Sequence, residues 1–215
     1  MATAPRLLLV RHGETNENVQ ETDQGIVQGQ LDTPLNEVGR RQAIMTGNAL
    51  KDVPLARIVS SPLARAKDTA NEIARHHPEI SVETDARIME RNFGVLQGQK
   101  YRGPSQKPED TQGIESSVAM TARLDSFFQD IRPSAAQSEG VTVIVSHGGA
   151  LSCLMNNVML PSGQVVLEPH VTPSRFWNCS ITEISLGQSP AILSRWADTM
   201  HLTESSEVIN VDESL

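Results

Sequence analysis

Two short apolar runs, each leading into a histidine and a glycine, constrain the fold of this chain more than any other feature. Residues 7–10 read Leu-Leu-Leu-Val before Arg11-His12-Gly13, and residues 141–145 read Val-Thr-Val-Ile-Val before Ser146-His147-Gly148-Gly149. Such runs are typical of parallel strands that helices cover on both faces. Ligands in open α/β sheets bind at the carboxyl ends of the strands. The runs therefore place His12 and His147 at one edge of a sheet, each followed by glycine that lets the backbone approach a ligand.

A third strand is expected over residues 55–59, directly before a helix signal. Ser61 is expected to cap a helix over 63–76, with Pro62 at its first position. A strand that runs straight into a helix is the repeating unit of parallel α/β sheets.

Three further helices and a hairpin follow from the remaining periodicities. Asn36 is expected to cap a helix over 37–51. Helices are also expected near 116–131 and 151–159, and residues 178–186 with 191–196 predict an antiparallel hairpin at one edge of the sheet. The expected core positions are Val118, Leu124, Phe127, Phe128 and Ile131 in the first of these helices, and Leu151, Leu154, Met155, Val158 and Met159 in the second.

This alternation predicts an α/β fold, a three-layer α/β/α sandwich with a mostly parallel central sheet and one antiparallel edge. The chain has 215 residues, which suits a single domain over 1–202. Residues 203–215 form an acidic tail that is expected to be frayed. Two stretches without a core pattern, 15–34 and 99–113, are expected to be long loops with a functional role.

Charge and cysteine content limit the partners and the location. The formal net charge is −8 at pH 7, which argues against a broad nucleic-acid or anionic-membrane surface. Any bound anion must therefore meet a local cluster of cations. The two cysteines, Cys153 and Cys179, lack metal-site spacing, and no apolar run suits a signal peptide or a membrane span. We expect a cytoplasmic protein without a metal or other cofactor; its oligomeric state cannot be read from the sequence.

Two arginines and one glutamate are the remaining candidates for chemistry. Arg11 precedes His12, and Arg65 lies shortly after the third strand; the guanidinium group matches phosphate oxygens. Glu90 lies among apolar and glycine residues, where a partly desolvated carboxyl group could donate a proton. Each residue alone has a plainer interpretation: a structural histidine, a solvated helix face for Arg65, and a surface carboxylate for Glu90.

Together these segments resemble the histidine phosphatase superfamily, in its phosphoglycerate-mutase-like branch. The resemblance rests on five blocks in the family's order, which span roughly residues 6 to 155. The matching residues are 8–15 with Asn18, 28–29 with 32–43, 60–70, 89–98 and 145–149.

The resemblance implies a role for each matching residue. His12 matches the nucleophile that becomes phosphorylated, and Glu90 matches the general acid. Arg11, Arg65 and His147 match the phosphate pocket. The implied further contacts to substrate come from Asn18, from the backbone N–H of Gly148 and from Gln30, Arg91 and Tyr101.

The resemblance implies a metal-independent phosphatase that acts on a small phosphorylated metabolite. Two departures from the mutase pattern favour hydrolysis over intramolecular transfer. Gln30 stands where the mutase pattern has a tryptophan, and the segment after Gly98 is short. The loop between Asn18 and Gln28 is also longer than is common. Residues 100–102 (Lys-Tyr-Arg) could meet a second acidic group or form a solvated loop. The alternatives are a mutase-type phosphotransferase, a catalytically silent phosphate-binding module and a pyrophosphate-processing biosynthetic enzyme.

Overall fold

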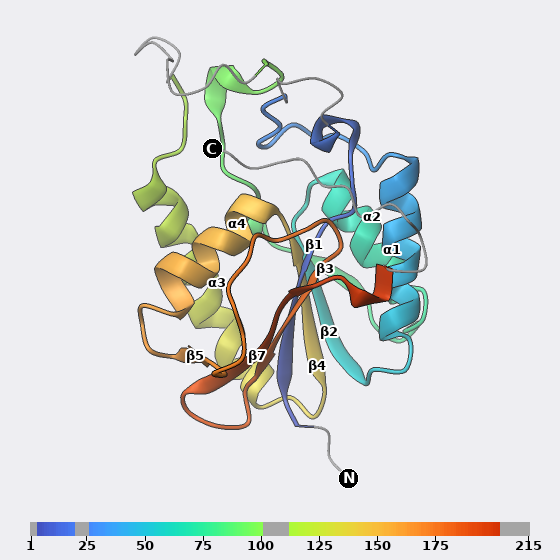
Figure 1. The fold of residues 1–215 in the computed structure, drawn as a ribbon, viewed down its shortest axis with the longest axis vertical. Coiled ribbons are helices and arrows are strands. Elements are labelled where there is room, and N and C mark those ends of the chain that lie inside the picture. Colours follow the sequence, from blue (N-terminus) through green and yellow to red (C-terminus); the bar gives the residue numbers. More distant parts are fainter. Residues whose placement is uncertain (1–3, 20–25, 101–111, 203–215) are drawn as a thin grey trace.

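A sheet of seven strands forms the centre of the molecule, in the order β3-β2-β4-β1-β6-β7-β5 (Figure 1). The computed structural model describes residues 4–19, 26–100 and 112–202. Tyr101 and the tail 203–215 lie outside this range. The strands are β1 (Arg6–Arg11), β2 (Leu55–Ser60), β3 (Val82–Thr84), β4 (Val141–Ser146), β5 (Val165–Leu167), β6 (Ile181–Ser185) and β7 (Ala191–Asp198).

Helices cover both faces of this sheet. One face carries α1 (Glu37–Leu50) and α2 (Ala64–Ala74), and the other carries α3 (Ser117–Ala136) and α4 (Gly148–Cys153), which continues into the π-helical turn η5 (Leu154–Met159). The expected α/β fold of three layers is confirmed. The short 3-10 turns are η1 (Asn16–Asn18), η2 (Ala86–Ile88), η3 (Gly94–Leu96) and η6 (Met200–Leu202).

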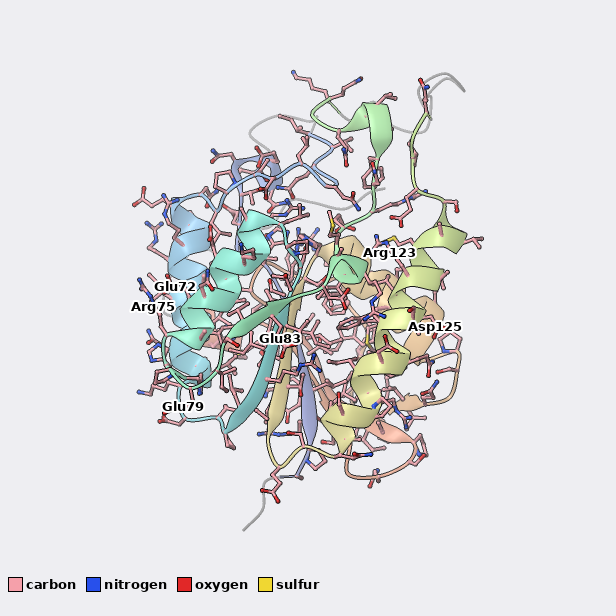
Figure 2. All side chains as sticks on the ribbon, turned by 180° about the vertical axis from the view of Figure 1, so that it is seen from behind. Glu72, Arg75, Glu79, Glu83, Arg123 and Asp125 are labelled. Atoms are coloured by element: carbon pink, nitrogen blue, oxygen red, sulfur yellow. The ribbon has the colours of Figure 1, made fainter. Side chains whose placement is uncertain are left out.

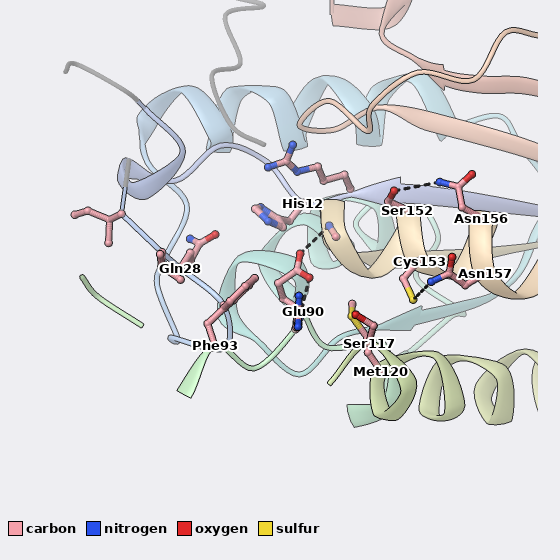
Figure 3. Close-up of a pocket in the computed structure, with 16 residues that line it drawn as sticks. His12, Gln28, Glu90, Phe93, Ser117, Met120, Ser152, Cys153, Asn156 and Asn157 are labelled. Atoms are coloured by element: carbon pink, nitrogen blue, oxygen red, sulfur yellow. Dashed lines mark hydrogen bonds between the residues drawn. The ribbon is translucent and has the colours of Figure 1, made fainter. Parts of the chain in front are cut away.

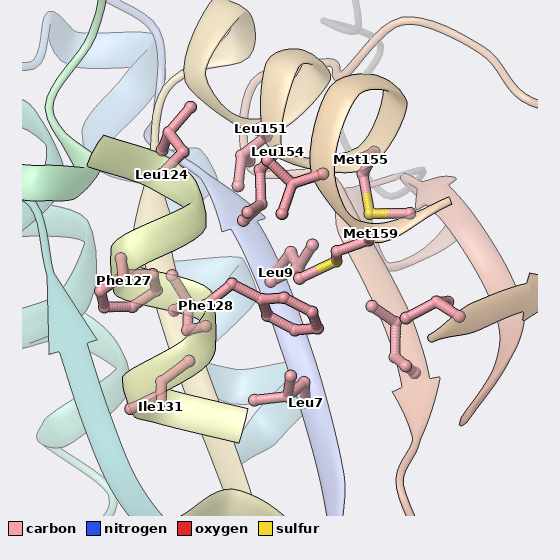
Figure 4. Close-up of a cluster of buried hydrophobic side chains, with 14 of the residues drawn as sticks. Leu7, Leu9, Leu124, Phe127, Phe128, Ile131, Leu151, Leu154, Met155 and Met159 are labelled. Carbon is pink, nitrogen blue, oxygen red and sulfur yellow. The ribbon is translucent and has the colours of Figure 1, made fainter. Parts of the chain in front are cut away.

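Burial on both faces explains the apolar run of β1. Leu7 and Leu9 point into the core beneath α3, α4 and η5 (Figure 4). Leu8 and Val10 point to the opposite core, against α2. Successive side chains of a strand alternate between faces, so a strand buried on both sides needs apolar residues at every position.

The pairing of β1 with β4 brings the two histidines together. The strands are parallel, with Arg11 opposite Ser146. The backbone N–H of His12 donates to the carbonyl of Ser146 at 3.0 Å. Each histidine therefore leaves its strand at the same edge of the sheet, as the sequence predicts.

The position of the hairpin differs from expectation. Strands β6 and β7 are antiparallel, but β5 pairs with β7 on its outer side, in parallel. The expectation that the hairpin forms the edge is wrong, because β5 is a strand of three residues, too short to carry a clear pattern. Strand β6 is consequently an antiparallel strand inside the sheet.

Helix starts and core positions show two further corrections. Asn36 caps α1 as expected, since its Oδ1 accepts from the N–H of Gly39 at 2.7 Å. Ser61 does not cap α2; instead, Oδ1 of Asp32 accepts from the N–H of Ala64 at 2.6 Å. Val118 is 79% exposed, and Met120 fills the core in its place. In the described part of the chain, no helix is long and apolar enough to cross a membrane.

Candidate active site

His12 lies at the carboxyl end of β1 with its ring orientation fixed by the backbone. Its Nδ1 is 2.7 Å from the carbonyl oxygen of Gly13. A carbonyl oxygen only accepts hydrogen bonds, so Nδ1 carries the proton and Nε2 carries the lone pair. Burial, together with the charges of Arg65 and Arg11, holds the pKa of His12 well below its usual range. The neutral ring with an unprotonated Nε2 is the form that can act as a nucleophile.

Arg65 faces this lone pair from the first turn of α2. Its Nε donates to Nε2 of His12 at 3.2 Å. Its terminal nitrogens donate to the carbonyls of Leu31 at 2.7 Å and Gly29 at 2.8 Å. The side chain is fully buried, and burial lowers the pKa of Arg65 to about 10. A buried cation therefore lies beside the nucleophilic nitrogen, on the side of its lone pair.

His147 and Arg11 complete this end of the site. The rings of His12 and His147 are 5.1 Å apart between centroids. Nε2 of His147 is 2.7 Å from the hydroxyl of Ser61, while its buried Nδ1 has no hydrogen-bond partner among the described residues. Burial and the charge of Arg65 hold the pKa of His147 well below its usual range. Arg11 donates to the carbonyl of Phe176 at 2.7 Å.

Glu90 stands across the site from His12, at the start of α4 (Figure 3). Its Oε2 accepts from the N–H of Gly149 at 2.9 Å, and its Oε1 accepts from the N–H of Arg91 at 2.7 Å. A Cβ atom on residue 149 would lie 2.6 Å from Oε1 of Glu90. Glycine at this position therefore lets the carboxyl group of Glu90 approach the first turn of α4 closely enough to accept from a backbone N–H.

The backbone around Glu90 is held by side chains from distant parts of the chain. Arg123 on α3 donates to the carbonyls of Arg87 at 2.6 Å, Met89 at 2.8 Å and Glu90 at 3.1 Å. It also pairs with Glu115 at 2.6 Å. Gln30 donates to the same carbonyl of Glu90 at 2.9 Å. These contacts fix the direction in which the carboxylate points.

A cavity of about 370 Å³ opens between these groups and extends along α4 and α3 (Figure 3). This volume is typical of small-molecule sites. His12, Arg11 and Glu90 are among the residues that line it. The remaining lining residues are Ile26, Val27, Gln28, Gly29, Arg91, Phe93, Ser117, Met120, Gly149, Ser152, Cys153, Asn156 and Asn157.

The predicted catalytic residues therefore gather in one place, whereas the predicted substrate contacts behave differently. Asn18 is buried, and its Oδ1 accepts from the N–H of Thr15 at 3.1 Å. Gln30 holds the backbone of Glu90, and Arg91 lines the cavity while its Nε donates to the carbonyl of Glu115 at 2.9 Å. Gly148 is the first residue of α4. Their roles toward a substrate stay predictions.

Helix packing requires a glycine at position 13, directly after His12. A Cβ on residue 13 would lie 2.5 Å from the carbonyl oxygen of Gly39 in α1. Gly13 thus allows α1 to pack against the backbone beside the nucleophile. A packing requirement thus accounts for glycine at this position, and the expectation that the backbone here approaches a ligand stays a prediction.

For several residues of the site, the sequence gives no indication of the group that they contact. Arg123 acts on a segment more than thirty positions earlier in the chain, and Asp32 caps a helix that begins at Ala64. Ser61 is recognisable as a capping residue by type, yet its hydroxyl contacts His147. Only the tertiary structure brings these groups to their partners.

Comparisons with known proteins point to one family. A family model described as the histidine phosphatase superfamily (branch 1) matches residues 7–199. A probable phosphoglycerate mutase GpmB from Yersinia enterocolitica is 31% identical over an alignment of 220 positions, and this alignment covers 92% of this chain and 94% of that protein.

Solved structures with the same fold include phosphatases. A mycobacterial glucosyl-3-phosphoglycerate phosphatase superposes with a TM-score of 0.71 at 27% identity, over 91% of this chain and 100% of that one. Bacillus stearothermophilus YhfR superposes with a TM-score of 0.73 at 28% identity, over 92% and 98% of the two chains.

Proposed function

The chain belongs to the histidine phosphatase superfamily, and on that premise we propose that it hydrolyses a phosphomonoester of a small metabolite through a phosphohistidine on His12. The observation that carries the proposal is the tautomer of His12. Its protonated Nδ1 is bound to Gly13, so the lone pair of Nε2 is the one available.

The first displacement transfers the phosphoryl group to the protein. The lone pair of Nε2 attacks phosphorus, the bond from phosphorus to the ester oxygen breaks, and Glu90 protonates the departing oxygen. In the free enzyme, Nε of Arg65 donates to Nε2 of His12 at 3.2 Å. A bound phosphoryl group takes over this donor, which releases the lone pair for attack.

The second displacement regenerates the histidine. Water attacks phosphorus, Glu90 takes up the proton that water loses, and the bond between nitrogen and phosphorus breaks with its electron pair returning to Nε2. Dividing the reaction into two displacements makes each step easier than direct hydrolysis.

Charge and position supply the remaining stabilisation. Three oxygens of the transferred group carry negative charge in a loose transition state. Arg65, Arg11 and His147 surround the place where His12 would hold this group, and their positions are fixed before substrate arrives. Donors that need no reorganisation stabilise such charge most effectively. These side chains can serve a phosphatase without a metal cofactor, so we expect activity to survive excess EDTA.

A mutase-type transfer is the second candidate, because a curated relative at 31% identity is a probable phosphoglycerate mutase. Gln30 favours hydrolysis: its side chain donates to the backbone of Glu90 at 2.9 Å and stands where mutases carry tryptophan.

We also propose a cytoplasmic location. Both cysteines are free thiols, which supports this location.

The test is capture of the intermediate. The protein is mixed with para-nitrophenyl phosphate, quenched with alkali on the millisecond scale, and examined for phosphohistidine by mass spectrometry. We expect a phosphorylated His12 in the unaltered protein, and no turnover in a folded His12→Ala variant. Hydrolysis by that variant at near the original rate would rule out the covalent route.

A further inference from the structure

The helix that leads away from Glu90 presents a polar face without charge. Ser152, Cys153, Asn156 and Asn157 line the cavity at helical spacing after Gly149 (Figure 3). Their neighbours at Leu151, Leu154, Met155, Val158 and Met159 fill the core. Residues 148–159 contain no Asp, Glu, Lys or Arg. We call the four lining residues, together with Ser117 of α3, the neutral groove.

Other helices of this protein expose charged side chains. Glu72 of α2 pairs with Arg75, the residue directly after this helix, at 3.0 Å (Figure 2). Glu37 and Arg41 pair at 3.0 Å on α1. Charged residues are the usual choice for a helix face that only meets water. The neutral face beside the active site therefore calls for a different explanation.

The backbone is also unusual at this point. Residues 154–159 form a π-helical turn, and the N–H of Leu160 donates to the carbonyl of Met155, five residues earlier, at 3.0 Å. Single π-helical turns inside helices are rare and occur frequently at functional sites. This turn follows Cys153 and carries Asn156 and Asn157.

The facing wall of the cavity adds apolar surface. Met120 and Ser117 of α3 line it opposite α4, and Phe93 lines the cavity on the other side of Glu90 (Figure 3). The charged side chains among the described lining residues are Arg11, Glu90 and Arg91. Arg91 lies over the ring of Phe93 at 5.4 Å and donates to Glu115. Apart from these three charged residues and His12, the described lining consists of hydroxyl, amide and thiol groups together with apolar side chains and glycine.

We propose that the neutral groove binds the uncharged, hydroxyl-rich alcohol portion of the substrate, so that the preferred substrates are monophosphates of sugars or polyols. This inference rests on the proposed phosphatase function. Hydroxyl and amide groups can both donate to and accept from sugar hydroxyls, while Phe93 and Met120 cover the carbon–hydrogen faces. A carboxylate or second phosphate in the groove would lose hydration without meeting a cation among the five groove residues, which is costly.

Four substrates and three variants test this assignment. Rates of phosphate release are measured with glucose 6-phosphate, 3-phosphoglycerate, fructose 1,6-bisphosphate and para-nitrophenyl phosphate. We expect kcat/KM to be highest for glucose 6-phosphate among the three metabolites, by about tenfold, a difference equivalent to one or two hydrogen bonds. Ser152→Ala and Asn156→Ala should each lower the ratio of kcat/KM for glucose 6-phosphate to that for para-nitrophenyl phosphate, by about threefold to tenfold.

Asn71→Ala on α2 is the matched control, because Asn71 is an exposed asparagine on the other side of the sheet. This variant should leave the ratio unchanged. The assignment would be overturned by a preference for 3-phosphoglycerate or the bisphosphate, or by a ratio that neither groove variant alters. The proposed function would still stand in that case if para-nitrophenyl phosphate is hydrolysed. Failure to hydrolyse para-nitrophenyl phosphate at all would instead remove the proposed function.

Discussion

Nδ1 of His12 lies 2.7 Å from the carbonyl oxygen of Gly13, and this contact selects the ring nitrogen that acts on a substrate. The carbonyl accepts the Nδ1 proton and leaves Nε2 with a lone pair, toward which Arg65 points. The same residue that fixes the tautomer must be a glycine, because α1 packs against it. Gly13 thus has two roles: it leaves room for α1, and its carbonyl fixes the tautomer of the nucleophile.

Glu90→Gln should slow the enzyme according to the leaving group. The amide keeps the size of the side chain but cannot transfer a proton, and general acid catalysis contributes about 10²- to 10⁴-fold. An alkyl phosphate should lose most of that factor in kcat/KM, and para-nitrophenyl phosphate much less, because its phenolate leaves without protonation. The control is Glu79→Gln, an exposed glutamate remote from the cavity. Equal losses on both substrates would remove the acid role of Glu90.

Arg123→Ala should lower kcat with little change in KM. The arginine donates to three carbonyls around Glu90 but does not line the cavity. Its loss should therefore leave the carboxyl group of Glu90 without a fixed position, while phosphate binding stays unaltered. We expect about tenfold lower kcat, with unfolding free energy reduced by about 1–3 kcal/mol, and partial recovery in Arg123→Lys. Arg132→Ala on the same helix is the control. A folded variant with unchanged kcat would show that Arg123 serves stability alone.

Ser61→Ala should change the tautomer of His147. The N–H of Leu63 points to the Ser61 oxygen at 3.4 Å, which leaves the hydroxyl proton for Nε2 of His147 at 2.7 Å. Nδ1 then carries a proton and can donate to a phosphoryl oxygen. Nitrogen-15 NMR of histidine-labelled protein should report this tautomer in the original chain and its loss in the variant, with kcat/KM down about tenfold. Ser60→Ala removes a neighbouring buried hydroxyl and should preserve the tautomer. Protonated Nε2 in the original protein would contradict the assignment.

Stability should fall as the pH drops below about 6.5. Burial first, and then the charge of Arg65, lower the pKa of both His12 and His147 in the folded protein. Below 6.5 the unfolded chain therefore binds more protons than the folded one, and each histidine costs up to about 1.4 kcal/mol per pH unit. Above 6.5 this contribution is constant. Urea unfolding between pH 7 and 5 measures the slope, which should be shallower in a His147→Asn variant. Equal slopes would argue against a buried neutral His147.

The sequence by itself determined the fold class and the gathering of the principal groups at one edge of the sheet. Two apolar runs ending in His12 and His147 were enough, because strands buried on both faces need uniform apolarity and parallel strands end at a common edge. The cap at Asn36 and the core positions from Leu151 to Met159 followed from local spacing in the same way. Short-range patterns are sufficient where the physical constraint is itself short-range.

The tertiary structure decided everything that depends on long-range approach. Strand β5 has three residues and no periodicity, so only its partner β7 defines it. Val118 is exposed because helical spacing sets it on the opposite side of α3 from Leu124 and Phe127, so this miss came from local spacing and not from the tertiary structure. Arg123 reaches Glu90, Asp32 caps α2, and Ser61 contacts His147 rather than its own helix. Such hydrogen bonds depend on the distance between groups in space, which residue spacing along the chain does not fix.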